Sequence, residues 1–154
     1  MALSGRRKPQ TDYELVPSKF EDGRGFVVTQ VEDGVELWWQ TLPRGDGLES
    51  LPVVGTSHRM KALQSQDFAP GKTVSLVPEP QNPDDPNAIG VWNEKESLQV
   101  GYIPNKDATR LGRKIERGEQ FRCIVIWETM QGRKRATIRI LLIRQGASIS
   151  GPIL

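Results

Sequence analysis

The chain has 154 residues, of which 36% are hydrophobic and 26% are charged, and its formal net charge is +2. This length suits one domain with a short addition, which buries enough surface to need no disulfide or metal. One cysteine (Cys123) and one histidine (His58) exclude an internal disulfide and a zinc site of the Cys/His type, and no apolar run approaches the ~18 residues of a membrane span. No apolar run follows the basic residues at 6–8. We therefore expect no secretory signal, and a cytoplasmic protein with no cofactor, no metal and no membrane partner.

The charge is distributed unevenly along the chain. Residues 1–103 contain ten Lys/Arg and fifteen Asp/Glu, a net charge of −5, whereas residues 104–154 contain eleven and four, a net charge of +7. A basic C-terminal third attracts polyanions such as nucleic acid. The other interpretation is that these charges are solvated faces that help solubility, and charge alone favours this second interpretation.

The first 50 residues predict an N-terminal extension with one β-hairpin. Residues 1–12 are polar and basic, so we expect a frayed start. Residues 26–41 predict the hairpin, because β-branched and aromatic residues lie on both sides of a turn at Asp33 and Gly34. The loop at 43–47 contains proline and glycine, and it marks the expected boundary between the extension, 1–50, and the main domain, 51–146.

The main domain predicts short strands around one helix. Strands are expected at 51–55, 73–77, 88–92, 98–103, 121–129 and 136–143. A loop with four prolines, 78–86, separates two of them. The helix is expected at 105–117, because Ala108, Leu111 and Ile115 share one face. Residues 147–154 show no periodicity and predict a flexible tail. This order predicts a mostly β fold, either a small β-barrel or a curled sheet.

Three segments of the main domain resemble the HIRAN domain family. A Val-Gly pair at 54–55 is followed by Thr-Ser-His, and residues 79–89 carry the pattern Glu-Pro-x-Asn-Pro-x-Asp-x-Asn-Ala-Ile. Residues 100–104 then read Val-Gly-Tyr-Ile-Pro, and Ala108 follows in the family's order. The resemblance does not extend to residues 1–50.

The resemblance implies an OB-like β-barrel that binds the free 3′ end of single-stranded DNA, as in fork-remodelling DNA translocases that carry this domain. It implies that an aromatic side chain after the Val-Gly strand stacks on the terminal base, and that Asp85 accepts a hydrogen bond from the 3′-hydroxyl beside Asn82. Stacking contributes about 1–3 kcal/mol per base and is indifferent to sequence. A carboxylate accepts a charge-assisted bond from a hydroxyl but repels a 3′-phosphate.

The chain departs from the family where tyrosines follow the Val-Gly strand. Here those positions hold His58 and Arg59, and Ser57, which precedes them, is a further candidate DNA-binding residue. A histidine ring or a guanidinium can stack on a base, less well than tyrosine, and both can also bind a phosphate. Asn82 and Asp85 also have a plainer interpretation, in which they only shape the proline-rich loop through their own backbone.

Further candidate DNA-binding residues lie around the predicted helix. Tyr102 shares a strand face with Val100, so it is either part of the core or the floor of a groove. Lys106 and Arg110 lie one turn apart at the helix start and suit a phosphate, or they belong to a solvated basic face. The basic run at 133–135 is either a finger that reaches a backbone or a solubilising turn.

The adjacent residues Trp38 and Trp39 point to opposite sides of a strand, so one of them is expected to be exposed or to cover a protein partner. The chain lacks the Gly-x-x-x-x-Gly-Lys-Ser/Thr phosphate loop of the large family members, and Asp84 and Asp85 are the one adjacent carboxylate pair in residues 51–146. We therefore predict no enzyme activity. The predicted function is a nucleic-acid-binding module for single-stranded DNA or its 3′ end. The alternative is a protein-interaction adaptor that has lost DNA-end binding.

Overall fold

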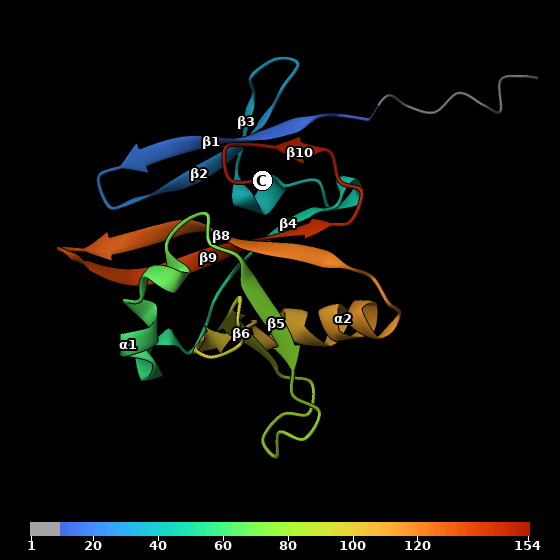
Figure 1. The fold of residues 1–154 in the computed structure, drawn as a ribbon. Coiled ribbons are helices and arrows are strands. Elements are labelled where there is room, and N and C mark those ends of the chain that lie inside the picture. Colours follow the sequence, from blue (N-terminus) through green and yellow to red (C-terminus); the bar gives the residue numbers. More distant parts are fainter. Residues whose placement is uncertain (1–9) are drawn as a thin grey trace, which may run out of the picture.

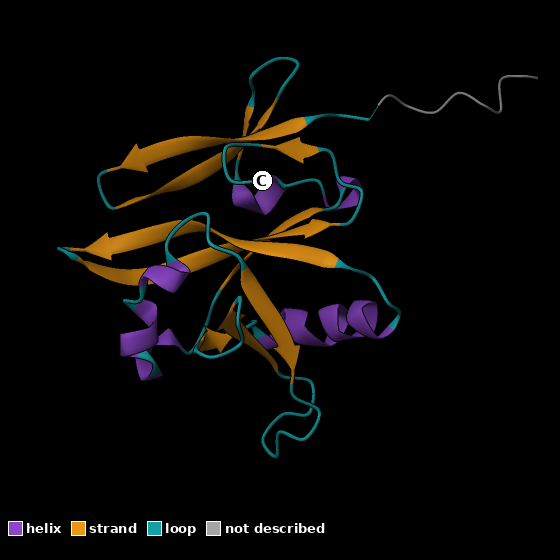
Figure 2. Cartoon of the chain, in the orientation of Figure 1, coloured by secondary structure: helices purple, strands orange, loops and turns teal. Residues whose placement is uncertain are grey.

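The computed structural model describes residues 10–154 and has a mostly β fold built from two sheets (Figures 1 and 2). The larger sheet has the order β10 (Ile149–Ser150), β1 (Tyr13–Phe20), β2 (Gly23–Gln30), β8 (Phe121–Gln131), β9 (Lys134–Arg144), β4 (Leu48–Pro52), and β3 (Glu36–Leu37) also pairs with β2. The smaller sheet has the order β5 (Val74–Pro78), β6 (Ile89–Asn93), β7 (Gln99–Tyr102). The prediction of a mostly β fold is confirmed, whereas the expected frayed start falls largely outside the described residues.

The described residues contain two α-helices, the predicted one and one further short one. The predicted helix is α2 (Asn105–Glu116), which ends one residue earlier than expected. It buries Ala108 and Leu111 in the core, and Gly118, with a φ of 85°, takes the left-handed conformation that follows many helix ends. The sequence does not predict α1 (Met60–Leu63), because four residues carry too little periodicity to be recognised.

The strands β8 and β9 are covered on both faces. Alternate side chains point to opposite sides, so Cys123 and Val125 lie in one hydrophobic cluster and Ile124 and Ile126 lie in the other. The first cluster includes residues of the smaller sheet and α2, and the second includes residues of β1, β2 and β4. The central hairpin therefore carries the family-like domain on one face and the N-terminal extension on the other (Figure 1).

The two sheets do not close into the single barrel that was expected. They are joined by two isolated bridges, between Val54 and Tyr102 and between Thr73 and Ile124. The strand β5 ends at Pro78, where the proline-rich loop begins, and the loop forms no strand. Proline lacks the backbone donor that a sheet ladder needs, so the smaller sheet cannot continue into a closed barrel at this end.

The N-terminal extension differs from the predicted hairpin at 26–41. Its main hairpin joins β1 to β2 over eight residue pairs, from Tyr13 opposite Gln30 to Phe20 opposite Gly23. The strand β3 has only two residues, and Trp39–Thr41 forms a 3₁₀ helix, η2. β1 could not be predicted from the sequence, because Pro17 and polar side chains interrupt its apolar alternation.

The C-terminal segment also differs from the expected flexible tail. Residues 149–150 form β10, which pairs in parallel with the start of β1. Two residues are too few to leave a strand pattern in the sequence. The domain boundary near residue 50 stays a prediction, and β2 of the extension pairs directly with β8 of the main domain. No helix in residues 10–154 is long and apolar enough to cross a membrane.

Candidate nucleic-acid interface

The proline-rich loop is shaped by the side chains that the sequence singles out. Asn82 Oδ1 accepts hydrogen bonds from the backbone N–H groups of Asp84, at 2.9 Å, and of Asp85, at 3.2 Å. Asp85 Oδ1 accepts from the N–H of Asn87 at 2.9 Å. The turn-shaping interpretation is therefore met for both residues. The bond from Asn87 uses only one carboxylate oxygen of Asp85, Oδ1, and Oδ2 receives no hydrogen bond from the described residues.

Glu79 joins this loop to β7. Its Oε1 accepts from Tyr102 Oη at 3.1 Å and from Asn82 Nδ2 at 3.0 Å. One carboxylate oxygen thus fixes the ring of Tyr102 beside the base of the loop. This role of Glu79 was not predicted from the sequence. The signal that could have indicated it is the position of Glu79 in the Glu-Pro-x-Asn-Pro pattern, three residues before Asn82.

The Val-Gly strand end lies next to β7 because two backbone groups pair there. Val54 and Tyr102 exchange both N–H···O bonds, each at 2.9 Å. This approach requires Gly101, since a Cβ at that position would lie 2.4 Å from the carbonyl oxygen of Val54. The pairing brings Arg59 to Tyr102, with the guanidinium carbon 6.0 Å from the ring centroid.

Ser57 and His58 lie in η4 (Thr56–His58), a 3₁₀ turn that follows Gly55 in the left-handed conformation. Both side chains are exposed and make no hydrogen bond to the described residues. Arg59 therefore contacts Tyr102, and Glu79 joins Tyr102 to Asn82, which in turn bonds the backbone of Asp85. Ser57 and His58 precede Arg59 directly in the chain.

Arg110 and Lys106 do not join this group of contacts. The Arg110 guanidinium binds both carboxylate oxygens of Glu49, with Nη1 3.0 Å from Oε2, and donates to Asp107 Oδ1 at 3.2 Å. The hydrogen bond to Glu49 raises the pKa of Arg110. Arg110 is thus a neutralised tether between α2 and β4. Lys106 is exposed and lines a separate pocket with Trp39 and Arg139.

The site is an open surface and not a deep cavity. A groove of about 490 Å³ runs between the proline-rich loop and α2, and its lining includes Pro80, Asn87 and Arg113. None of the eight residues predicted from the sequence lines it. The described residues contain no cluster of three or more His, Cys, Asp or Glu side chains that would hold a metal ion.

The fold and this loop together define a small mostly β domain with an exposed polar surface at the edge of its smaller sheet. The model of the HIRAN domain family matches residues 47–142, and the chain belongs to this family. The match leaves out most of the N-terminal extension.

Two solved structures are similar to the chain. The chain is similar to the HIRAN domain of human HLTF, with 23% identity, a TM-score of 0.51, and coverage of 64% of this chain and 75% of that one. A protein from Lactobacillus plantarum matches with 22% identity, a TM-score of 0.49, and coverage of 62% and 92%. At this identity the likeness to HLTF shows a shared fold. No curated protein matches the chain.

Proposed function

We propose that this protein binds nucleic acid at the surface formed by Arg59, Tyr102 and the loop of Asn82 and Asp85, and that its ligand is the 3′ end of single-stranded DNA. The observation that carries the proposal is the state of Asp85. One of its oxygens holds the loop through the N–H of Asn87, and the other has no partner in the described chain. An acceptor that the fold has already oriented suits a terminal hydroxyl.

The neighbouring side chains supply the other contacts that a strand end needs. Tyr102 is fixed by Glu79 and lies under Arg59, so a planar cation and an aromatic ring offer surfaces on which a base stacks. The exposed His58 and the partly buried Arg59 replace the family's tyrosines and can bind the last phosphate. Ser57 adds a hydroxyl at the same turn, and Lys106 follows Tyr102 by four residues, at the start of α2.

A second candidate function, the binding of another protein, is favoured by one observation. The extension exposes large apolar side chains, with Trp38 68% exposed and Phe20 51% exposed, and Val31 and Val35 are exposed nearby in the chain. Apolar surface of this kind is typical of protein interfaces. Such an interface depends little on salt, whereas a strand that places ~3 phosphates on the protein predicts a log–log salt slope near −2.

Fluorescence anisotropy with short single-stranded DNAs tests the proposal. The strands end in a 3′-hydroxyl or a 3′-phosphate, and a blunt duplex of the same sequence is the third ligand. We expect the parent protein to prefer the 3′-hydroxyl, and Asp85→Ala to lose that preference. Asp84→Ala is the matched control, because it removes the adjacent carboxylate, whose oxygens bond no loop group.

Equal binding of the parent to all three ligands would reduce the proposal to a general basic surface. The absence of DNA binding at low salt would favour the protein-partner function.

A further inference from the structure

Arg139 is a half-buried arginine that has no carboxylate partner among residues 10–154. It lies on β9, where its Nε donates to Ser50 Oγ at 3.2 Å, and its guanidinium carbon lies 4.9 Å from the centroid of the Trp39 ring. Nη1 and Nη2 make no hydrogen bond to the described residues. Burial lowers the pKa of Arg139, because desolvation disfavours the charged form.

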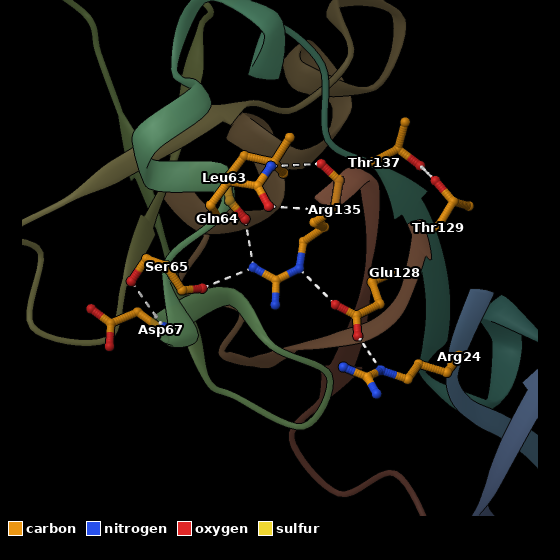
Figure 3. Close-up of polar contacts among 9 residues, drawn as sticks. All are labelled: Arg24, Leu63, Gln64, Ser65, Asp67, Glu128, Thr129, Arg135 and Thr137. Atoms are coloured by element: carbon orange, nitrogen blue, oxygen red, sulfur yellow. Dashed lines mark hydrogen bonds and ion pairs between the residues drawn. The ribbon is translucent and has the colours of Figure 1, made fainter. Parts of the chain in front are cut away.

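Two other arginines, Arg135 and Arg110, differ from Arg139 because carboxylates pair with their guanidinium groups. Arg135 is buried, but its Nε lies 2.7 Å from Glu128 Oε1, and two backbone carbonyls accept from Nη1 (Figure 3). Arg110 is bound by Glu49 on both oxygens. Removing a cation from water is unfavourable unless an anion compensates it. Arg139 lacks such an anion within the described chain. An anionic ligand would supply the missing negative charge.

The surroundings of Arg139 form a pocket with an excess of positive charge. The pocket is about 260 Å³, and its lining includes Trp39, Arg44, Lys106 and Arg139. Its two acidic residues, Glu49 and Asp107, are bound by Arg110 from beside the pocket, and Glu49 Oε1 also lies 3.7 Å from Arg44 Nε. The charges of Lys106 and Arg139 are therefore left uncompensated, which suits a phosphate group.

One further feature indicates a nucleotide and not a bare anion. The indole of Trp39 is half-buried against Trp127, with ring centroids 5.4 Å apart, so it is held in place beside the Arg139 guanidinium. A fixed aromatic ring beside a planar cation is a surface on which bases stack.

The pocket adjoins the proposed 3′-end surface. Its lining includes Pro52, two residues before Val54, and Val54 pairs directly with Tyr102. Lys106 follows Tyr102 by four residues at the start of α2. A strand whose last base lies near Tyr102 can therefore continue along this edge toward Trp39.

We propose that Trp39, Lys106 and Arg139 form a second nucleotide subsite, which holds an internal nucleotide of the strand whose 3′ end is bound near Asp85. The phosphate contacts Lys106 and Arg139, and the base stacks beside Trp39. This inference rests on the proposed function, since the occupant is the same strand. Trp39 precedes the family match at 47–142, so the N-terminal extension contributes the aromatic ring of this subsite, whereas Lys106 and Arg139 lie within the match.

The test compares two single strands that both end in a 3′-hydroxyl. OB-fold sites span ~4–16 nucleotides, so a strand of about 3 nucleotides is shorter than such a site, and a strand of about 12 nucleotides fills one. We expect Arg139→Gln to weaken binding of the longer strand about 3- to 10-fold and to reduce its log–log salt slope by about 0.7, the share of one phosphate on a single strand. Binding of the shorter strand and the preference for a 3′-hydroxyl should not change. Arg117→Gln is the matched control, because it removes one charge at the exposed far end of α2.

Trp39→Leu provides a second variant, and it should weaken the longer strand about 5-fold or more through lost stacking. Thermal unfolding of each variant shows whether the fold is intact. If the parent binds neither strand, the proposed function fails and the subsite fails with it. If the parent binds both strands with a 3′-hydroxyl preference and Arg139→Gln equals the parent on the longer one, the subsite is overturned and the proposed function stands. Competition by polyglutamate of equal charge as effective as by DNA would also overturn the subsite, because it would indicate a general anion surface.

Discussion

Glu128 of β8 and Arg135 of β9 form a buried ion pair at the point where the N-terminal extension meets the HIRAN domain. Glu128 Oε1 lies 2.7 Å from Arg135 Nε, and Glu128 Oε2 lies 2.6 Å from Nε of Arg24 on β2 (Figure 3). Arg135 Nη1 in turn donates to the carbonyl oxygens of Leu63 and Ser65. One carboxylate therefore connects the extension, the central hairpin and the segment around α1.

The first prediction concerns the stability that this pair provides. Glu128→Ala leaves Arg135 buried without its anion, so we expect the free energy of unfolding to fall by about 3–5 kcal/mol. Arg24→Ala removes the partner whose side chain is 60% exposed, and it should cost less than about 1 kcal/mol. Urea denaturation of both variants measures the difference. Equal losses of unfolding free energy in the two variants would mean that the buried ion pair stabilises the protein no more than the exposed one.

The second prediction is the pH dependence of the same carboxylate. Burial alone would raise the pKa of Glu128, but hydrogen bonds from Arg24 and Arg135 outweigh burial and hold the pKa below its ordinary value. A carboxyl group with a lowered folded-state pKa contributes stability above its unfolded pKa of about 4.3, and this stability is lost as the pH falls through the folded-state pKa.

Unfolding should therefore become easier below about pH 4.3 in the parent, and less steeply so in Glu128→Gln, which cannot ionise. Urea midpoints measured across this range compare the two proteins. Parallel curves would contradict the assigned shift.

A third prediction concerns Cys123. The thiol is buried on β8 in the first hydrophobic cluster, and burial raises its pKa well above the ordinary range. A thiolate is the reactive form, so Cys123 should not react with a thiol reagent such as dithionitrobenzoate in native buffer, and it should react fully in denaturant. Rapid labelling of the native protein would show that β8 opens locally.

The fold could be predicted from the sequence where patterns are long and local. The helix from Asn105 has buried residues at regular spacing, and it forms within one residue of the expected end. The two-residue strands β3 and β10 carry no pattern, and Pro17 interrupts β1, so the architecture of the extension could not be predicted. These elements depend on long-range pairing with β2 and β1, which a local pattern does not contain.

The candidate site shows the same limit. The family signature indicated Asn82 and Asp85, whose bonds are local and lie within one loop. Glu79 connects to Tyr102, 23 residues away in the chain, and Arg110 binds Glu49, 61 residues away. Helix spacing predicts that Arg110 and Lys106 share a face, but it does not show that Glu49 on β4 already binds the Arg110 guanidinium. Such partners come from tertiary packing alone.

The last prediction tests whether the close approach of β7 to the Val-Gly strand sustains the site. A Cβ at Gly101 would lie 2.4 Å from Val54 O and 2.8 Å from Val53 Cγ1, so Gly101→Ala must push the two segments apart. We expect a loss of about 1–3 kcal/mol in the free energy of unfolding. DNA binding should weaken in addition, because Val54 pairs directly with Tyr102.

Gly112→Ala is the matched control for this substitution. It lies inside α2, where an added Cβ meets no atom within 4 Å, so it should stabilise the protein by about 0.5–1 kcal/mol and leave binding unchanged. Anisotropy titrations of both variants, at a temperature where each is folded, separate stability from binding. Unaltered binding by a folded Gly101→Ala protein would show that the position of Tyr102 beside Val54 is not needed for the ligand.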